Sequence, residues 1–186
     1  MRFVDTALRG VILIEIDVFP DARGHFFEIS HAKKYAEGGI TAPFVQSNFS
    51  RSSRGTLRGL HYQLIQPQGK LVTVVEGAIF DVAVDIQVGS PTFGRFVCYE
   101  LSLENKRQLY IPPGYAHGFY ALTETVGVVY NCTDFYSPKG ERGILWNDRA
   151  IGIPWPEQNQ PNLSPKDAAY KTLADMAGEL PVYRPA

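Results

Sequence analysis

Apolar and polar residues alternate in short stretches along most of this chain, and turn residues separate the stretches roughly every ten residues. The apolar stretches are rich in Val, Ile, Phe and Tyr, the residues that favour strands. Those that stand out are residues 11–19, 70–77, 78–87, 95–103, 108–111, 117–122 and 126–133. Many short strands with turns between them predict a mainly β protein, a sandwich or a barrel.

Two stretches are expected to be helical. Residues 31–39 form a short polar segment that ends at Gly38 and Gly39, residues that stop helices. Ser164 and Pro165 suit an N-cap and a first helical position, which predicts a second helix running to Gly178. The expected organisation is a single domain over residues 1–186, with a helical extension from about residue 164.

Composition excludes several classes of partner. The chain is 45% hydrophobic and 20% charged with a net charge of −1, which gives no overall field for nucleic acid or an anionic surface. The first apolar run is broken by Glu15 and Asp17 and does not resemble a signal peptide. No stretch approaches the roughly 20 apolar residues of a membrane helix. A cytoplasmic protein is expected, with Cys98 and Cys132 as buried free thiols.

The stretch around His61 carries most of the candidate chemistry. Side chains alternate along a strand, so His61 and Gln63 share one face while Arg58 lies on the other, unless the strand bends at Gly59. A histidine base near the cations Arg58 and Lys70 would suit proton abstraction beside a carbonyl or an anionic substrate. A structural histidine would show the same pattern, and this stretch alone favours that interpretation.

Two segments have the spacing of the conserved boxes of cupins. The first contains His61, Gln63 and Lys70, and the second is the segment PPGYAH, which ends at His117. In a metal-binding cupin the positions of Gln63 and Lys70 hold a histidine and an acid. A protonated lysine repels a metal, so the pattern favours a cupin pocket without metal.

A more specific resemblance extends over nearly the whole chain. The motifs RGLHYQ, QGKLV, IFDVAVDI, SPTFG, LSLENKRQLYIPPGYAHGF, ILWND and LSPKDAA look like those of the dTDP-4-dehydrorhamnose 3,5-epimerase family. The resemblance implies a cupin-type jelly-roll barrel with a few short helices, one of them near the C-terminus. It also implies a homodimer that epimerises a nucleotide-linked 4-keto-6-deoxyhexose at C3 and C5, without metal or redox cofactor.

The resemblance assigns roles to four catalytic residues. His61 would be the base that removes protons alpha to the ketone, and Asp167 the carboxylate that orients it. Lys70 would donate a hydrogen bond to the C4 oxygen as the enolate forms. Tyr130 would return a proton on the opposite face, as a phenol that stays protonated at neutral pH.

The resemblance also implies a set of substrate-binding residues, which are mostly charged or amides. They are Arg23, Glu28, Gln46, Asn48, Arg58, His117, Glu141 and Lys166. Phe26 and Phe135 are candidates to stack on the pyrimidine, whereas Asp81 and Asp85 are expected to be structural. The alternatives are epimerisation at one carbon or of a related nucleotide sugar, a metal-dependent cupin isomerase or oxygenase, and a non-catalytic binding module.

Overall fold

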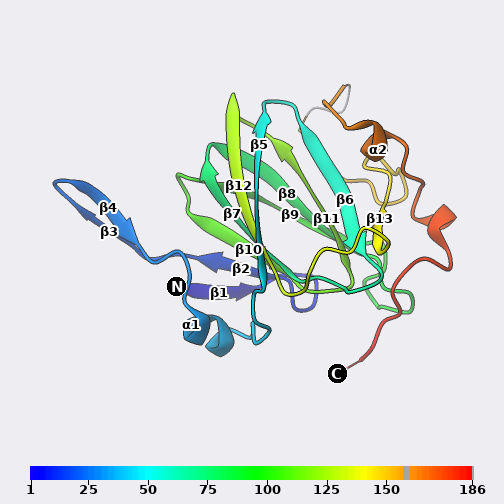
Figure 1. Cartoon of the computed structure of the whole chain (residues 1–186), viewed down its shortest axis with the longest axis horizontal. Coiled ribbons are helices and arrows are strands. Elements are labelled where there is room, and N and C mark those ends of the chain that lie inside the picture. Colours follow the sequence, from blue (N-terminus) through cyan, green and yellow to red (C-terminus); the bar gives the residue numbers. More distant parts are fainter. Residues whose placement is uncertain (157–159, 186) are drawn as a thin grey trace.

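In the computed structural model, which describes residues 1–156 and 160–185, two antiparallel sheets face each other (Figure 1). The first has the order β1 (Arg2–Asp5), β2 (Ile12–Glu15), β10 (Arg107–Ile111), β7 (Lys70–Glu76), β12 (Thr125–Cys132) and β5 (Gln46–Ser53). The second has the order β13 (Glu141–Gly143), β6 (Leu57–Gln63), β11 (Tyr115–Ala121), β8 (Ala78–Asp85) and β9 (Phe96–Ser102). From β5 to β13, the chain passes repeatedly from one sheet to the other. This confirms the predicted mainly β jelly roll.

The alternation of side chains gives each sheet a buried inner face. Val72, Val74 and Val128 of the first sheet pack against Ile79 and Phe119 of the second, in one apolar cluster. Within the described residues the sheets are not joined by a hydrogen-bonded ladder, so the jelly roll is a sandwich that is open at its end rather than a closed barrel. The apolar cluster occupies only part of the space between the sheets, and polar side chains line the rest.

Short segments cover the outer faces of both sheets. Helix α1 (Ala32–Glu37) packs Tyr35 against the first sheet, with Gly38 as its C-cap as predicted. The C-terminal segment packs Leu173, Met176 and Leu180 onto the second sheet. No helix in the described part of the chain is long and apolar enough to cross a membrane.

The predicted C-terminal helix is much shorter than expected. Helix α2 spans only Pro165–Ala168, and a 3-10 turn at Ala174–Met176 follows it. Between them the backbone of Lys171 pairs with the second sheet, where the Leu145 amide donates to its carbonyl at 2.8 Å. Helical propensity is a weak preference, and this pairing outweighs it. The predicted N-cap is confirmed, because the Ser164 hydroxyl accepts the Asp167 amide at 3.0 Å.

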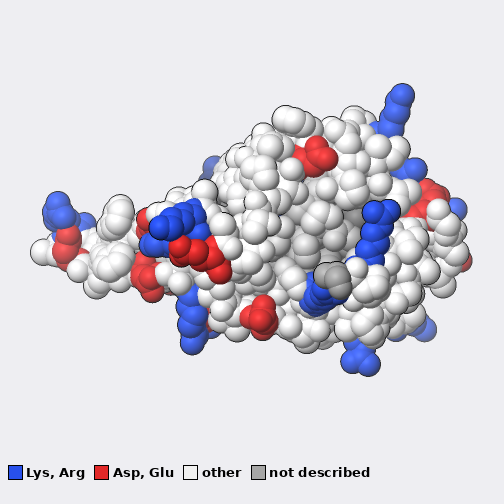
Figure 2. Space-filling model, turned by 90° about the horizontal axis from the view of Figure 1, so that it is seen from below, with Lys and Arg blue, Asp and Glu red and all other residues white. Residues whose placement is uncertain are grey.

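A two-stranded hairpin, β3 (Val18–Asp21) and β4 (Gly24–Phe27), extends away from the body of the molecule (Figure 1). We call this hairpin the arm. Figure 2 shows it projecting beyond the body, with acidic and basic side chains side by side where it begins. Phe19 and Phe26 are 60% and 70% exposed on it. An isolated hairpin with exposed phenylalanines is marginally stable in water, so this arm is a surface that favours contact with another molecule.

Strand β6 bends where the sequence left two arrangements open. His61 pairs with His117 of β11, but Arg58 pairs with Phe119, so three steps along β6 match two along β11. The extra residue is a bulge, and it moves Arg58 onto the same face as His61. Gly59 has a φ of 136° and lies so close to β11 that a Cβ there would be 2.5 Å from the Gly118 Cα. The glycine is therefore required by both its conformation and its contact.

Candidate active site

Two adjoining cavities lie between the sheets and share His61, Lys70, Tyr130 and Glu141 in their walls. The outer cavity has a volume of about 300 Å³ and is completed by Gln46, Asn48, Tyr62, Gln63, Gln68 and Tyr136. The inner cavity has a volume of about 190 Å³ and is completed by Ser50, Arg58, His117 and Phe119. All four predicted catalytic residues, with Asp167 directly behind His61, are thus brought together from distant parts of the chain.

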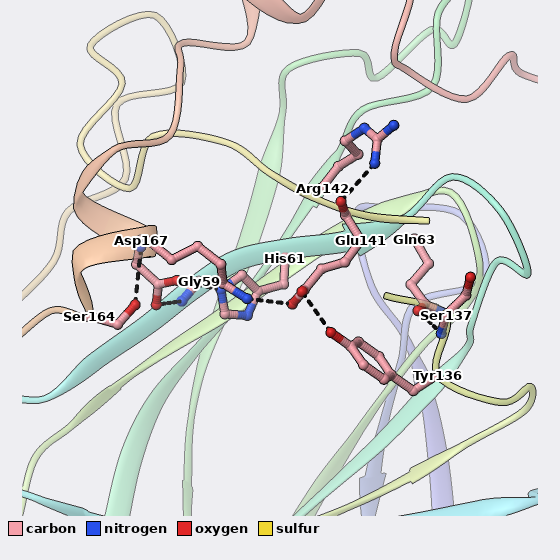
Figure 3. A network of polar contacts seen from close by, with 10 residues as sticks. Gly59, His61, Gln63, Tyr136, Ser137, Glu141, Arg142, Ser164 and Asp167 are labelled. Atoms are coloured by element: carbon pink, nitrogen blue, oxygen red, sulfur yellow. Dashed lines mark hydrogen bonds and ion pairs between the residues drawn. The ribbon is translucent and has the colours of Figure 1, made fainter. Parts of the chain in front are cut away.

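His61 is held by Asp167 from the short helix α2. Its Nε2 lies 2.8 Å from Asp167 Oδ1, and the Gly59 amide donates to the other carboxylate oxygen at 3.3 Å (Figure 3). Burial opposes ionisation of Asp167, but its hydrogen bonds with His61, Gly59 and Ser164 outweigh this and hold its pKa below the usual value. The Asp167 contact occupies Nε2 and leaves Nδ1 of His61 as the nitrogen available to a substrate. This geometry suits a general base that is stabilised once it takes up a proton.

Lys70 and Tyr130 come from neighbouring strands of the opposite sheet. Lys70 pairs in register with Cys132 of β12, and Tyr130 with Val72 of β7, so both side chains point inward. Burial lowers the pKa of the Lys70 amine, and nearby Cys132 and Asp81 oppose this only in part. Burial also raises the pKa of the Tyr130 phenol. The site therefore holds an amine whose charged form is poorly solvated and a phenol that is protonated at neutral pH.

A charged cluster borders the outer cavity. Glu141 accepts hydrogen bonds from Lys166 Nζ at 2.7 Å and from the Tyr136 hydroxyl at 2.8 Å (Figure 3 shows the second contact). Burial would raise the pKa of Glu141, but these two contacts outweigh it and keep the carboxylate ionised. Glu141 and Lys166 thus lie together at the site, as predicted. Tyr136 was missed, and its only sequence signal was an aromatic position five residues before Glu141 in the chain.

Glutamine side chains fix the loop that carries Tyr136. Gln46 Oε1 accepts the Tyr136 amide at 2.9 Å, and Gln63 Oε1 accepts the Ser137 amide at 2.7 Å (Figure 3 shows the second contact). Gln68 Nε2 donates to the Asp134 carbonyl at 2.7 Å. Gln63 occupies the position of a cupin metal ligand, yet here its amide is used to anchor a loop.

A second histidine–aspartate pair lies beside the first. His117 Nε2 is 2.7 Å from Asp81 Oδ1, and the Asp81 side chain is 0% exposed. The expectation that Asp81 is structural is therefore incomplete, because Asp81 holds a histidine of the inner cavity. Asp85 does fit the structural expectation, since it accepts the Gln87 amide at 2.9 Å and the Thr92 hydroxyl at 2.6 Å within a turn.

Three predicted binding residues lie outside these cavities, on or next to the arm. Arg23 is 90% exposed in its side chain and pairs with Asp21 at 2.6 Å. Glu28 pairs with Lys34 at 2.8 Å, and Phe26 lies on the exposed surface of the arm. Within one chain, the structure does not bring these three residues to the site. Phe135, by contrast, is 58% exposed on the loop that borders the outer cavity.

The two histidines of the site do not belong to a metal-ligand cluster among the described residues. No group of three His, Cys, Asp or Glu side chains with metal-ligand geometry occurs among residues 1–156 and 160–185. Each of the two site histidines is already bonded to a carboxylate through Nε2. A charged Lys70 in the cavity that both histidines line would oppose a divalent cation electrostatically.

The chain closely resembles characterised proteins over almost its full length. The sequence profile of the dTDP-4-dehydrorhamnose 3,5-epimerase family matches residues 5–175. The dTDP-4-dehydrorhamnose 3,5-epimerase of Pseudomonas aeruginosa is 52% identical over 94% of this chain and 97% of its own length. The enzyme of that name from Neisseria gonorrhoeae is 53% identical over 94% of this chain, which spans about half (53%) of that longer protein.

The structural comparison agrees with the sequence. The dTDP-6-deoxy-D-glucose-3,5-epimerase of Legionella pneumophila, crystallised with dTDP-4-keto-L-rhamnose, is 51% identical and superimposes with a TM-score of 0.95 over 99% of both chains. Fold, motifs and overall identity therefore agree, and this chain belongs to the dTDP-4-dehydrorhamnose 3,5-epimerase family.

Proposed function

We propose that this protein epimerises dTDP-4-dehydro-6-deoxyglucose at C3 and C5 to give dTDP-4-dehydro-L-rhamnose. One observation carries the proposal: His61, Lys70 and Tyr130 line the same cavities, with His61 on one sheet and the other two on the facing sheet. Inversion of a carbon needs a base on one face of the sugar and an acid on the other. Two facing sheets supply such an arrangement.

The reaction would proceed by two proton transfers at each carbon. His61 takes the proton alpha to the ketone, and the electrons of the broken C–H bond move onto the C4 oxygen to form an enolate. Lys70 donates a hydrogen bond to that oxygen, where its poorly solvated charge is most effective. Tyr130 then delivers its proton to the opposite face of the carbon. Asp167 stays ionised and stabilises the imidazolium.

The remaining site residues suit the nucleotide diphosphate and the sugar hydroxyls. A third cavity adjoins His61 and is lined by Ser164 and Asp167 as well. Its two cations, Arg58 and Lys166, would bind pyrophosphate oxygens. Gln46, Asn48 and Glu141 border the outer cavity, and His117 the inner one. We infer that these residues hold polar groups of the substrate.

We further infer that the protein is a homodimer in which the arm of one copy reaches the site of the other. Arg23 and Phe26 have the chemistry to bind phosphate and to stack on a base, yet they lie on an exposed hairpin outside the cavities of their own chain. A second copy would both cover the exposed phenylalanines and provide the site that these residues match. A Phe19→Ser and Phe26→Ser double variant should then lower the molar mass measured by light scattering, whereas Val182→Ser, an equally exposed apolar position, should not.

The whole chain is proposed to act as one domain, because the C-terminal segment both covers the second sheet and supplies Asp167. We propose a cytoplasmic location, for which the free thiols Cys98 and Cys132 in the described residues are the structural support. Cell fractionation with an antibody against the protein tests the location.

The decisive experiment is incubation with dTDP-4-keto-6-deoxyglucose in D2O, followed by NMR. We expect deuterium at both C3 and C5 of the product, with inverted configuration at each. Deuterium at only one carbon would make the protein a single-carbon epimerase. A bound substrate without any exchange would make it a binding module and overturn the proposal.

A further inference from the structure

The second histidine–aspartate pair lies beside the first in the wall of the inner cavity. His117 and His61 are register partners on β11 and β6, and both line this cavity. Each is bonded to its aspartate through Nε2, which leaves Nδ1 for the cavity. Tyr130 lines the same cavity from the opposite sheet. The base, the acid and a further titratable group thus line one cavity.

Two buried polar atoms near this space have no hydrogen-bond partner among the described residues. They are Ser50 Oγ and Asp81 Oδ2. Buried polar atoms in folded proteins are nearly always bonded, if not to protein then to water or to a ligand. Ser50 lines the inner cavity directly, and a volume of about 190 Å³ is well above what one water molecule needs. The inner cavity therefore suits a hydrogen-bonded chain between His117 and the facing sheet.

A double epimerase has a chemical need for such a chain, and this step rests on the function proposed above. After one inversion, His61 has gained the proton removed from the carbon and Tyr130 has lost the one it delivered. The second inversion needs a neutral His61 and a protonated Tyr130. Both groups must therefore be restored while the half-converted sugar is still bound.

We propose that His117, held by Asp81, re-protonates Tyr130 across the inner cavity between the two inversions, with the Ser50 hydroxyl as a bridge. In this step the N–H bond of the His117 imidazolium breaks and the O–H bond of Tyr130 forms. His117 then regains a proton from the His61 imidazolium, which becomes neutral again. Asp81 remains ionised throughout and offsets the charge of the imidazolium. No proton is gained or lost overall, and no other reactant is required.

The other groups around the inner cavity are less suited to this step. Arg58 does not lose its proton in proteins. Lys70 is committed to the C4 oxygen, and Glu141 is bonded to Lys166 and Tyr136. Histidine is the side chain that exchanges protons readily near neutral pH. His117 is thus a group that acts through Tyr130, distinct from the residues that react with the sugar.

The test is a single-turnover experiment in D2O that follows the singly and doubly inverted sugars by NMR. Asp81→Asn keeps the shape of the side chain but cannot offset an imidazolium. We expect the first inversion to stay near the wild-type rate and the second to slow by roughly tenfold or more, so that the singly inverted sugar accumulates. Ser50→Ala should also slow the second inversion relative to the first. It removes no hydrogen bond between described residues. Ser47→Ala, on the other face of the same strand, is the matched control.

Chemical rescue separates a proton relay from a structural role. Free imidazole should restore the second inversion in His117→Ala, in proportion to its concentration, and should leave the wild type unchanged. Equal slowing of both inversions in Asp81→Asn and Ser50→Ala, or no rescue by imidazole, would overturn the inference. If the unsubstituted enzyme showed no exchange at either carbon, the proposed function would fail instead. If Asp81→Asn does not fold, the rates of the two inversions in Ser50→Ala decide whether the relay exists.

Discussion

In the cavities between the sheets, His61 is bonded to a carboxylate that Gly59 and Ser164 hold in turn, so the base has little freedom. On the arm, the side chain of Arg23 hydrogen-bonds only to Asp21 among the described residues, and it is 90% exposed. The cavities are built within one chain, whereas the arm projects from the body, and we propose that a second copy covers it. We therefore expect changes in the cavities to reduce turnover and changes on the arm to reduce binding.

The largest effect is expected at His61. His61→Asn should lower kcat by about 10²–10⁴-fold, because it removes the general base that Asp167 orients. The dissociation constant for dTDP should stay close to the wild-type value, since the cations remain. The measurement pairs steady-state kinetics with calorimetric titration of dTDP. A variant that keeps most of its turnover would remove His61 from the role of base.

Tyr130→Phe should separate exchange from inversion. His61, Asp167 and Lys70 still form the enolate, but the enolate regains a proton only from the His61 side. Deuterium should therefore enter C3 or C5 of recovered substrate with retained configuration, while epimer formation falls by roughly 10²–10⁴-fold. NMR of the recovered sugar in D2O measures both. Epimer formed at nearly the wild-type rate would assign the proton donor to another group.

Lys70→Met should lower kcat by about 10²–10³-fold, as expected for the loss of a donor to a developing oxyanion. Affinity for dTDP should change little, because the charge is needed chiefly when negative charge forms on the C4 oxygen. Lys33→Met on the exposed face of α1 is the matched control. A large loss of affinity with unchanged kcat would instead make Lys70 a phosphate-binding residue.

The same contrast between cavities and arm explains what the sequence could predict. His61, Lys70 and Asp167 lie in long motifs with characteristic spacing, and the structure brings all three together. Arg23 and Glu28 carry the same kind of signal, but within one chain they lie outside the cavities, and their place in the site rests on the proposed second copy. Motif matching identifies residues of a site without showing which copy of the chain provides them.

Other errors came from tertiary contacts that override local preference. The C-terminal helix was predicted to reach Gly178, but the pairing of Lys171 with the second sheet ends it at Ala168. The face of Arg58 could not be decided because it depends on a bulge opposite Gly118. Tyr136 was missed because its contact with Glu141 requires a loop that Gln46 and Gln63 hold in place.

On the arm, Arg23→Ala should weaken binding rather than chemistry. The loss of a hydrogen bond between charged groups costs about 1.5–3 kcal/mol, which corresponds to roughly tenfold to hundredfold in affinity. We expect KM and the dissociation constant of dTDP to rise by that factor while kcat is nearly unchanged. Arg149→Ala, an exposed arginine on the segment that covers the second sheet, should have no effect. A fall in kcat without a change in KM would mean that the arm takes part in the chemistry.

The smallest effect is expected from removal of divalent metals. Gln63 and Lys70 occupy the positions where a metal-binding cupin has ligands, and Gln63 is engaged with the Ser137 amide. Exhaustive dialysis against EDTA should therefore leave kcat and KM unchanged, with metal content followed by mass spectrometry of the same sample. Loss of activity that one specific divalent ion restores would transfer the role of Lys70 at the C4 oxygen to a metal.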